Sequence, residues 1–404
     1  MIVAVDCDIL SHWSNMGVVT YLMNLLEQFS RSESSHEFYV FVRKPPAELA
    51  ALAATEPKLK LVSPWGPGWF WKLLGGAFVA SPLGSGWFWK KLGSALVARR
   101  RGNILLFVPA HRVPLIPLIP KVVVIQDLGF ELFPHTFRRF QRKRMSWTTR
   151  LAVRRADLVI TSSESTKRDL ISCYGYRPER IRVVHLGYDN RAFEPSIVST
   201  EGSSATLKKY GLRAPFFLHV GVLQPRKNIV RLIEAFIKLM DENDLFDAQL
   251  AIVGKPGWKY KEIVQRAVAP NTKGRVILTG AVQSHELPIL YKNSLALVMP
   301  SLYEGFGLPI LEAMACGTPV TCSRGSSLSE IAGEAALFFD PYSVEEIANA
   351  IRNLWKEPSL RTNLIERGLQ QVKHFSWQKT ARETLKVFCE LMPVPGLSES
   401  NLCP

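Results

Sequence analysis

The chain has 404 residues, of which 47% are hydrophobic and 21% are charged, and its formal net charge is +15. This composition excludes a disordered protein, and the length exceeds what one compact core usually holds. No stretch reaches the roughly 18 uninterrupted apolar residues that a membrane span needs. The sequence therefore predicts a globular protein of two domains.

The positive charge is concentrated in the first half of the chain. Residues 1–200 contain 27 Lys and Arg against 15 Asp and Glu, a net charge of +12, whereas the remainder contains 23 against 20, a net charge of +3. This asymmetry predicts an anionic partner for the first half, such as nucleic acid, a phosphorylated lipid or an anionic membrane surface. A basic surface kept only for solubility is the alternative.

The order of apolar runs and helical patterns predicts an α/β fold. The chain opens with an apolar run and no basic leader, so we expect a buried strand there rather than a signal peptide. Strands that alternate with helices are typical of parallel sheets covered on both faces, and two such series predict two doubly wound domains. The predicted strands are Ile2–Val5, Phe38–Val42, Ile104–Phe107, Val122–Ile125, Leu158–Thr161, Ile181–Val184, Phe216–Val220, Leu250–Val253, Val276–Leu278, Leu295–Met299, Pro319–Cys322 and Ala336–Phe339.

Turn-forming and polar residues at 188–215 mark the expected seam between the domains. We place the first domain at residues 1–190 and the second at 191–375. A last helix is expected at 376–393, followed by a tail at 394–404 that is predicted to be disordered.

A Trp-rich insert at 63–101 interrupts the α/β pattern. Its segment Gly68–Gly75 recurs eighteen residues later as Gly86–Gly93, so that Trp69, Trp71, Trp87 and Trp89 accompany lysines. Tryptophan suits the headgroup level of a bilayer and lysine suits anionic lipid, so the repeat favours contact with a membrane interface. A small core under a long loop is the alternative.

The stretch from Phe137 to Arg155 is basic and partly apolar. It carries eight arginines and lysines, no acid, and interleaved Phe140, Trp147 and Leu151. A helix of this kind is typical of docking on anionic lipid. Nucleic acid would use similar charge, but no nucleic-acid-binding motif accompanies the stretch. A plainly solvated helix face remains the alternative.

The six cysteines show neither close pairing nor the spacing of metal ligands. We interpret them as reduced thiols of a cytosolic protein, and we expect no metal site.

The most informative segment for chemistry is SLYEGFGLPILEAMACGTPV at residues 301–320, which follows a predicted strand. Gly305 and Gly307 permit backbone close to a ligand, and Pro309 suits the first turn of a helix. A helix N-terminus at the carboxyl edge of a parallel sheet is a site for a diphosphate. We expect Glu304 to bind sugar hydroxyls and Glu312, about one turn into the helix, to bind ribose hydroxyls.

A second informative segment is HVGVLQPRKNIVRLIEAF at residues 219–236. A strand ends at Val220-Gly221, and Arg226 and Lys227 occupy the loop before a helix that is expected to start near Ile229. Two fixed cations at this junction would meet a donor pyrophosphate and the charge that develops on it as a glycosidic bond breaks.

Together these segments resemble the retaining, nucleotide-sugar-dependent glycosyltransferases of family 4, whose fold is called GT-B. The segments SSLSEIAGEAALFFDP in the second half and ADLVITSSESTKRDLI and RIRVVHLGYD in the first half fit the same family. The likeness covers residues 120–390 well and 1–50 loosely. It implies two Rossmann-like domains facing a cleft, with the acceptor on residues 1–190, the donor on 191–375, and the last helix crossing back.

The resemblance also implies roles for single residues. Lys227 with Arg226 would hold the diphosphate, Glu304 the hexose and Glu312 the ribose. Gln126 stands where the family commonly has a histidine near the reacting sugar, and it can form hydrogen bonds but cannot carry charge. The remaining expected donor contacts are Gly17, assigned to the phosphate side of the cleft, Gly221, Val282, Gly305, Phe306, Gly307 and Leu308.

The subgroup that this sequence most resembles is the bacterial mannosyltransferases of surface-polysaccharide synthesis. The expected donor is GDP-mannose, with a UDP-hexose as the alternative, and the expected acceptor is lipid-linked or a saccharide. We expect no cofactor, no required metal and no nucleic-acid partner. We expect the protein to lie in the cytoplasm, at the inner face of the membrane. A catalytically silent scaffold or lipid-binding subunit is the other class of function; an epimerase is disfavoured because it lacks the Glu304-Gly-Phe-Gly signature.

Overall fold

The structure is a computed structural model that describes residues 1–11, 17–62, 104–111, 119–194, 200–242, 244 and 247–392. The Trp-rich repeat and the C-terminal tail lie outside these residues, so the predictions about them stay predictions. Within the described ranges, no helix combines the length and the apolar content needed to cross a bilayer.

The first sheet has seven parallel strands in the order β3-β2-β1-β4-β5-β6-β7. The interior strand β1 carries Val3 and Val5, both fully buried, because a parallel strand is covered by helices on both faces. Its strands are β1 (Ile2–Asp6), β2 (Glu37–Phe41), β3 (Leu59–Val62), β4 (Ile104–Val108), β5 (Lys121–Ile125), β6 (Leu158–Thr161) and β7 (Ile181–Val183).

The second sheet has six parallel strands in the order β10-β9-β8-β11-β12-β13. The neighbours β8 and β11 are joined in register at Ala296 with Phe217 and Leu297 with Leu218, which brings the loops after these two strands together. Its strands are β8 (Phe216–Val220), β9 (Gln249–Val253), β10 (Val276–Gly280), β11 (Ala296–Met299), β12 (Val320–Ser323) and β13 (Ala336–Phe339).

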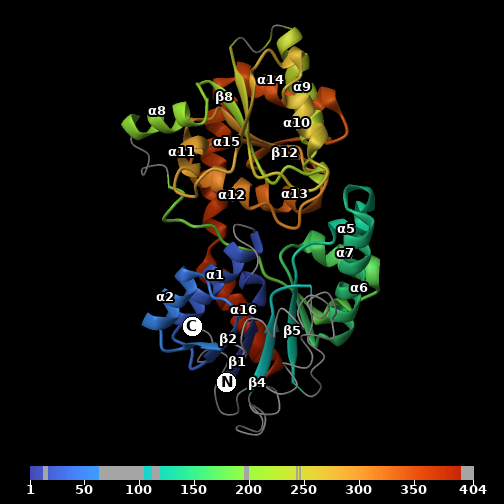
Figure 1. Ribbon diagram of the computed structural model, residues 1–404, viewed down its shortest axis with the longest axis vertical. Coiled ribbons are helices and arrows are strands. Elements are labelled where there is room, and N and C mark those ends of the chain that lie inside the picture. Colours follow the sequence, from blue (N-terminus) through green and yellow to red (C-terminus); the bar gives the residue numbers. More distant parts are fainter. Residues whose placement is uncertain are drawn as a thin grey trace.

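Helices connect the strands in both lobes of the molecule (Figure 1). Several begin at a serine whose hydroxyl accepts a hydrogen bond from a backbone N–H of the first turn, as Ser163 does at α7 and Ser343 at α14. The helices are α1 (Gly17–Arg31), α2 (Ala47–Thr55), α5 (Gly129–Leu132), α6 (Arg139–Arg155), α7 (Glu164–Tyr174), α8 (Thr200–Lys209), α9 (Ile229–Asp241), α10 (Lys261–Ala267), α11 (Leu287–Asn293), α12 (Leu308–Ala315), α13 (Ser326–Ala332), α14 (Val344–Lys356) and α15 (Pro358–Gln371).

The last helix, α16 (Trp377–Leu391), returns to the first lobe and packs against α1 (Figure 1). Its Phe388 ring lies 5.9 Å from the ring of Phe29 and 5.1 Å from that of Phe107. Where the chain crosses back, a side chain at Gly187 would collide with the backbone of Trp377, at 2.1 Å. The first strand, β1, and the last helix, α16, therefore belong to the same lobe.

One detail differs from the sequence-based expectations. The edge strand β3 was not predicted, because Leu59–Val62 is a four-residue run that includes a lysine. Among the described residues, Cys7, Cys173, Cys316, Cys322 and Cys389 form no disulfide with one another.

Candidate active site

The loop after β8 holds Arg226 and Lys227 in a short turn of 3-10 helix, Pro225–Lys227. Asn228 ends that turn in the left-handed conformation, with φ of 57°. Its side-chain amide donates to the carbonyl oxygens of Pro300, at 3.0 Å, and Pro341, at 2.7 Å. These two hydrogen bonds fix the loop against the segments that follow β11 and β13, so the two cations have a defined position.

Glu304 accepts hydrogen bonds from both cations. Its Oε1 lies 2.5 Å from Lys227 Nζ, and its Oε2 lies 3.1 Å from Arg226 Nη1. Ser301 Oγ donates to the same carboxylate at 2.7 Å. Burial alone would raise the pKa of Glu304, but the charges of Lys227 and Arg226 and the hydrogen bonds outweigh it and lower the pKa to about 2.

This contact joins residues that lie 77 positions apart in the sequence, at the carboxyl ends of neighbouring strands. Glu304 is ionised at neutral pH, so the cluster of Arg226, Lys227 and Glu304 keeps one net positive charge in a buried setting. An excess positive charge with few water molecules around it attracts an anion strongly. The cluster can therefore bind a phosphate group beside a carboxylate that accepts hydrogen bonds.

His219 is a buried residue of this region that sequence reasoning missed. Its Nδ1 lies 3.0 Å from the carbonyl oxygen of Val298, and its Nε2 has no partner among the described residues. Burial lowers the pKa of His219 to about 4, so the ring is neutral and Nδ1 is the donor to that carbonyl. Nε2 is then an acceptor 3.5 Å from where a side chain at Gly221 would start.

Gly305 is the point at which the first lobe meets this site. A side chain there would lie 2.1 Å from the carbonyl oxygen of Gln126 and 2.7 Å from Cβ of Asp127. The Gly305 carbonyl accepts hydrogen bonds from the hydroxyls of Ser162, at 2.9 Å, and Ser163, at 2.8 Å. We expected Gly305 to leave room for a ligand, but the backbone of the first lobe occupies that room.

Gln126 lies beside the candidate site, and its own carbonyl makes the close approach to Gly305. Its carbonyl accepts a hydrogen bond from Ser162 Oγ at 3.0 Å. Its side-chain Nε2 is buried and has no partner within the described residues. A buried amide without a partner costs free energy, which a polar ligand would recover.

Glu312 lies on α12, in a different environment from Glu304. Its Oε2 accepts a hydrogen bond from the hydroxyl of Tyr291 at 2.8 Å. Burial raises the pKa of Glu312 to about 7, and the hydrogen bond from Tyr291 offsets that effect only in part. The two glutamates therefore differ in charge state near neutral pH, and the structure gives them separate partners.

The structure places the other predicted donor contacts in different surroundings. Phe306 is buried with its ring 6.2 Å from that of His185 and 6.1 Å from that of Phe375, so its side chain packs inside the protein and only its backbone faces the loop. Gly307 has a φ of 113° and precedes Leu308, the first residue of α12. Val282 is half-buried after β10, whereas Gly17 is exposed at the start of α1 with open space around it.

Family comparisons match both halves of the chain. A family model described as "Glycosyl transferases group 1" matches residues 207–371, and one described as "Glycosyltransferase Family 4" matches residues 16–191. The "O-antigen chain mannosyltransferase B" of Escherichia coli is 31% identical over 268 residues, which are 66% of this chain and 69% of that protein. The chain belongs to the group 1, family 4 glycosyltransferases.

Other relatives of this glycosyltransferase share smaller parts of their length with it. The "Serotype-specific mannosyltransferase WbdA" of Escherichia coli is 28% identical over 70% of this chain, which covers 35% of that protein. A "D-inositol 3-phosphate glycosyltransferase" of Nocardioides is 29% identical over 58% of this chain and 54% of that protein.

Solved structures confirm the predicted GT-B fold of two Rossmann-like domains. The structure of Anabaena Alr3699/HepE in complex with UDP and glucose superposes with a TM-score of 0.73 at 19% identity, over 97% of this chain and 100% of that one. A sucrose-phosphate synthase from Thermosynechococcus elongatus superposes with a TM-score of 0.71 at 20% identity, over 96% of this chain and 98% of that one. At this identity the likeness concerns the fold.

The raised pKa of Glu312 gives a testable effect on the glycosyltransferase's stability. Between the usual value of 4.5 and about 7, the folded protein holds a proton on Glu312 that the unfolded chain has lost. The free energy of unfolding therefore falls as pH rises through this window, by about 2–3 kcal/mol. Glu312→Gln removes this pH dependence. Urea unfolding should therefore show that the variant's free energy of unfolding, relative to that of the parent, is higher at pH 8 than at pH 4.5. An unchanged difference at the two pH values would contradict the assignment.

Proposed function

We propose that this glycosyltransferase transfers a hexose, with mannose favoured, from a nucleoside diphosphate sugar to a lipid-linked or saccharide acceptor. The observation that carries the proposal is the buried cluster of Arg226, Lys227 and Glu304 at the carboxyl ends of β8 and β11. Open α/β sheets bind nucleotides at this edge. The mannosyltransferase names of the relatives favour GDP-mannose over a UDP-hexose as the donor.

Each part of the cluster has a role in this proposal. Lys227 and Arg226 bind the diphosphate and stabilise the charge that grows on it as the sugar leaves. Glu304 accepts hydrogen bonds from the hexose hydroxyls, which requires Lys227 to share its three donors between the carboxylate and the diphosphate. Glu312 accepts from the ribose, and Gln126, on the acceptor side, offers its unpaired amide to the sugar.

The anomeric configuration is retained in this proposal, as the family resemblance implies. This proposal does not use a pair of close carboxylates. Glu304 already binds two cations, and at a pKa of about 2 it is a poor proton donor. In this proposal the leaving diphosphate, held by Lys227, takes the proton of the acceptor hydroxyl as the new glycosidic bond forms. A product with inverted configuration would contradict this part.

A thermal-shift screen of nucleoside diphosphates and their sugars tests the donor assignment. A ligand that binds only the folded protein raises its melting temperature by mass action, so the correct base and sugar should give the largest shift. We expect GDP and GDP-mannose to exceed UDP and UDP-glucose. No shift with any nucleotide would favour a silent scaffold or lipid-binding subunit.

The two glutamates should separate in a binding assay. By calorimetry at pH 8.5, where Glu312 is ionised, Glu312→Gln should bind bare GDP about tenfold more weakly, because a hydrogen bond to a charged acceptor contributes about 1.5 kcal/mol. Glu304→Gln should bind bare GDP at least as tightly as the parent, since Lys227 and Arg226 lose their competing anion, and should lose affinity only for GDP-mannose. Parental GDP affinity in Glu312→Gln would refute the ribose assignment.

Activity should survive treatment with EDTA. The reason is the presence of two cations, Arg226 and Lys227, on a fixed loop beside the N-terminus of α12, where they can neutralise the diphosphate. Nucleotide release measured before and after chelation should agree within about twofold. Complete loss that magnesium restores would overturn this expectation.

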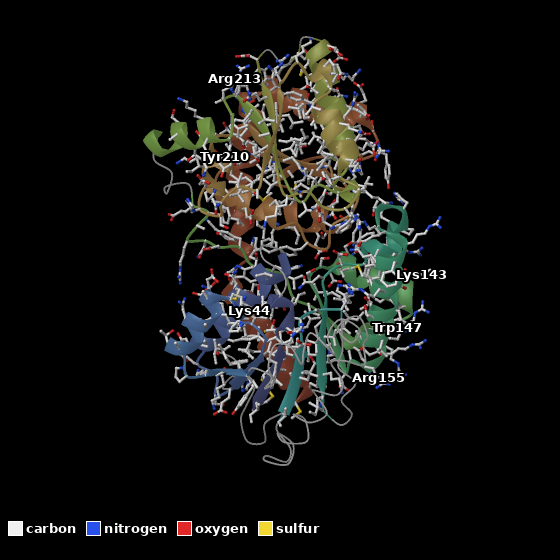
Figure 2. The ribbon with its side chains drawn as sticks, in the orientation of Figure 1. Lys44, Lys143, Trp147, Arg155, Tyr210 and Arg213 are labelled. Carbon is white, nitrogen blue, oxygen red and sulfur yellow. The ribbon has the colours of Figure 1, made fainter. Side chains whose placement is uncertain are left out.

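We place the glycosyltransferase at the inner face of the membrane in the cytoplasm, with α6 toward an anionic surface. On this helix the Phe140 side chain is 79% exposed and that of Trp147 is 53% exposed. Figure 2 shows Lys143, Trp147 and Arg155 along the outer side of α6. Exposed aromatic and basic side chains on one helix suit a headgroup layer. A lipid-linked acceptor would be met at the same surface.

A further inference from the structure

A second site lies in the first lobe, away from the sugar-transfer site. It is a cavity of about 400 Å³, within the roughly 300–1,000 Å³ of small-molecule sites, between the C-terminal ends of α6 and α7 and the segment 175–180. The first turn of α7 meets the second lobe, where Glu330 accepts from the backbone N–H of Glu164. The helix then runs 11 residues, about 16 Å, so the cavity at its other end is remote from Glu304.

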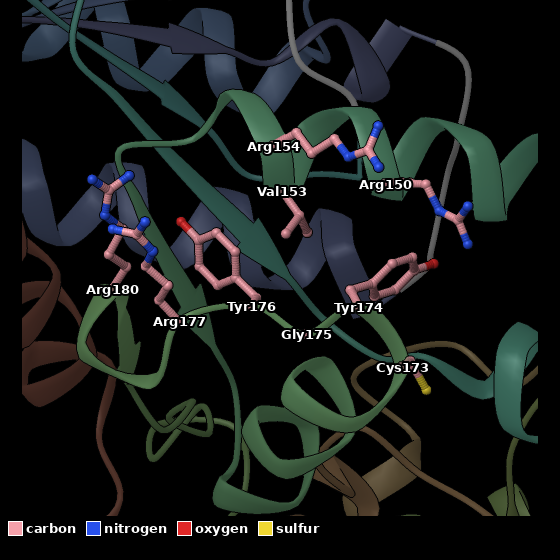
Figure 3. A pocket seen from close by; sticks show the side chains of 9 residues that line it. All are labelled: Arg150, Val153, Arg154, Cys173, Tyr174, Gly175, Tyr176, Arg177 and Arg180. Atoms are coloured by element: carbon pink, nitrogen blue, oxygen red, sulfur yellow. The ribbon is translucent and has the colours of Figure 1, made fainter.

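Four arginines line this cavity, namely Arg150, Arg154, Arg177 and Arg180 (Figure 3). No carboxylate lines it. Of the nearby acids, Glu131 accepts a hydrogen bond from the hydroxyl of Tyr174 at 2.6 Å, and Asp157 accepts one from the backbone N–H of Lys121 at 2.8 Å. Within the described residues none of the four guanidinium groups forms an ion pair, so the cavity holds a concentrated positive charge.

Two tyrosines give the cavity fixed walls. The guanidinium carbon of Arg150 lies 5.8 Å from the centre of the Tyr174 ring, and the hydroxyl of Tyr176 donates to the carbonyl of Ala156 at 3.3 Å. Figure 3 shows Tyr176 between the Arg177–Arg180 side and the α6 side of the cavity. Both rings are thus anchored, whereas the four arginines are exposed and would have to order around a ligand.

We propose that this cavity binds the terminal phosphate of an anionic membrane lipid headgroup. A phosphomonoester carries close to two charges and three acceptor oxygens, which match several guanidinium forks, whereas a phosphodiester offers one charge. The lipid source is favoured because Trp147, Arg150 and Arg154 follow one another at helical spacings of three and four residues. The exposed Trp147 therefore shares a face of α6 with two arginines of the cavity.

This inference rests on the membrane placement proposed above and names the lipid group that would be recognised there. The cavity proposal can be tested independently of the sugar-transfer proposal, because binding to vesicles requires no sugar donor. A protein that binds GDP-mannose normally and ignores lipid would overturn the cavity proposal alone.

The test uses the full chain and phosphatidylcholine vesicles that contain either phosphatidate or phosphatidylglycerol at equal total negative charge. We expect co-sedimentation to favour phosphatidate. The variant R150Q/R154Q/R177Q/R180Q should lose about tenfold more affinity for phosphatidate vesicles than the matched control R138Q/R139Q/R142Q/R144Q, which removes the same charge from the other end of the basic segment. The GDP-induced thermal shift should be unchanged in both variants.

The double variant R177Q/R180Q keeps the test decisive if the fourfold variant does not fold, because both residues lie outside α6. It should also lose the preference for phosphatidate. Equal losses in the cavity and control variants would show that spread charge, and not this cavity, binds the membrane. A thermal shift with millimolar glycerol phosphate that is lost in R177Q/R180Q, together with an absence of vesicle binding, would assign the cavity to a soluble phosphate and overturn the lipid proposal.

Discussion

Replacing Lys227 by alanine should lower kcat by about 10²–10³-fold while leaving the protein folded. The expected loss corresponds to about 2.7–4 kcal/mol, the usual contribution of one preorganised donor to the stabilisation of transition-state charge. Lys227 reaches the site from a loop that Asn228 fixes, and its Nζ already lies 2.5 Å from Glu304, so the positive charge is in place before the donor arrives. Steady-state kinetics of nucleotide release measure the effect.

The matched control is Lys261→Ala, which removes the same charge from an exposed position at the start of α10. It should leave kcat within about twofold of the parent, because exposed surface charges contribute little. If Lys227→Ala keeps parental turnover and donor affinity, Lys227 has no part in the mechanism.

Replacing Gly305 by alanine should also reduce turnover severely, by about 10²-fold. The reason is that the added side chain should displace the two lobes relative to each other. The added Cβ would lie 2.1 Å from the Gln126 carbonyl oxygen, and neither backbone can move freely. A displacement of about 1 Å between catalytic and acceptor groups is enough for a loss of this size. Donor binding should persist, because the cluster of Arg226, Lys227 and Glu304 lies wholly within the second lobe, so kcat should fall much more than GDP affinity.

A graded control is Ser162→Ala, which removes the hydroxyl that the Gly305 and Gln126 carbonyls share, leaves the Ser163 hydrogen bond to Gly305, and adds no atom. It should reduce turnover only severalfold, in line with about 1 kcal/mol for one hydrogen bond. Parental kinetics in Gly305→Ala would mean that the lobes are not joined at this contact during turnover.

The fold could be predicted largely because parallel strands are buried on both faces and appear as continuous apolar runs. The predicted runs near β1, β5, β8 and β11 match strands within one or two residues. The strand β3 escaped prediction because an edge strand is short and only partly buried, so Lys60 sits among its apolar residues. The start of α9 at Ile229 followed from the loop before it, whereas the last helix, α16 from Trp377, was expected from the family resemblance.

The candidate site was predictable as a list of residues but not as a set of contacts. The sequence placed Lys227 and Glu304 on separate segments with separate roles, and only the adjacency of β8 and β11 brings them within 2.5 Å. Gly305 was assigned to a ligand because a glycine in a loop cannot reveal which neighbour needs the space. His219 gave no signal, since a histidine at the end of a buried strand has the same pattern whether it is structural or functional.

The most direct measurement is nucleotide release from GDP-mannose by the purified protein, with a mannose-terminated saccharide as acceptor. The account predicts that GDP is released by the parent and by Lys261→Ala, that Lys227→Ala releases it about 10²–10³-fold more slowly, and that mannose appears on the acceptor with its anomeric configuration retained. Contradiction would be an absence of release from GDP-mannose and from every other nucleoside diphosphate hexose, or equal release by the parent and Lys227→Ala.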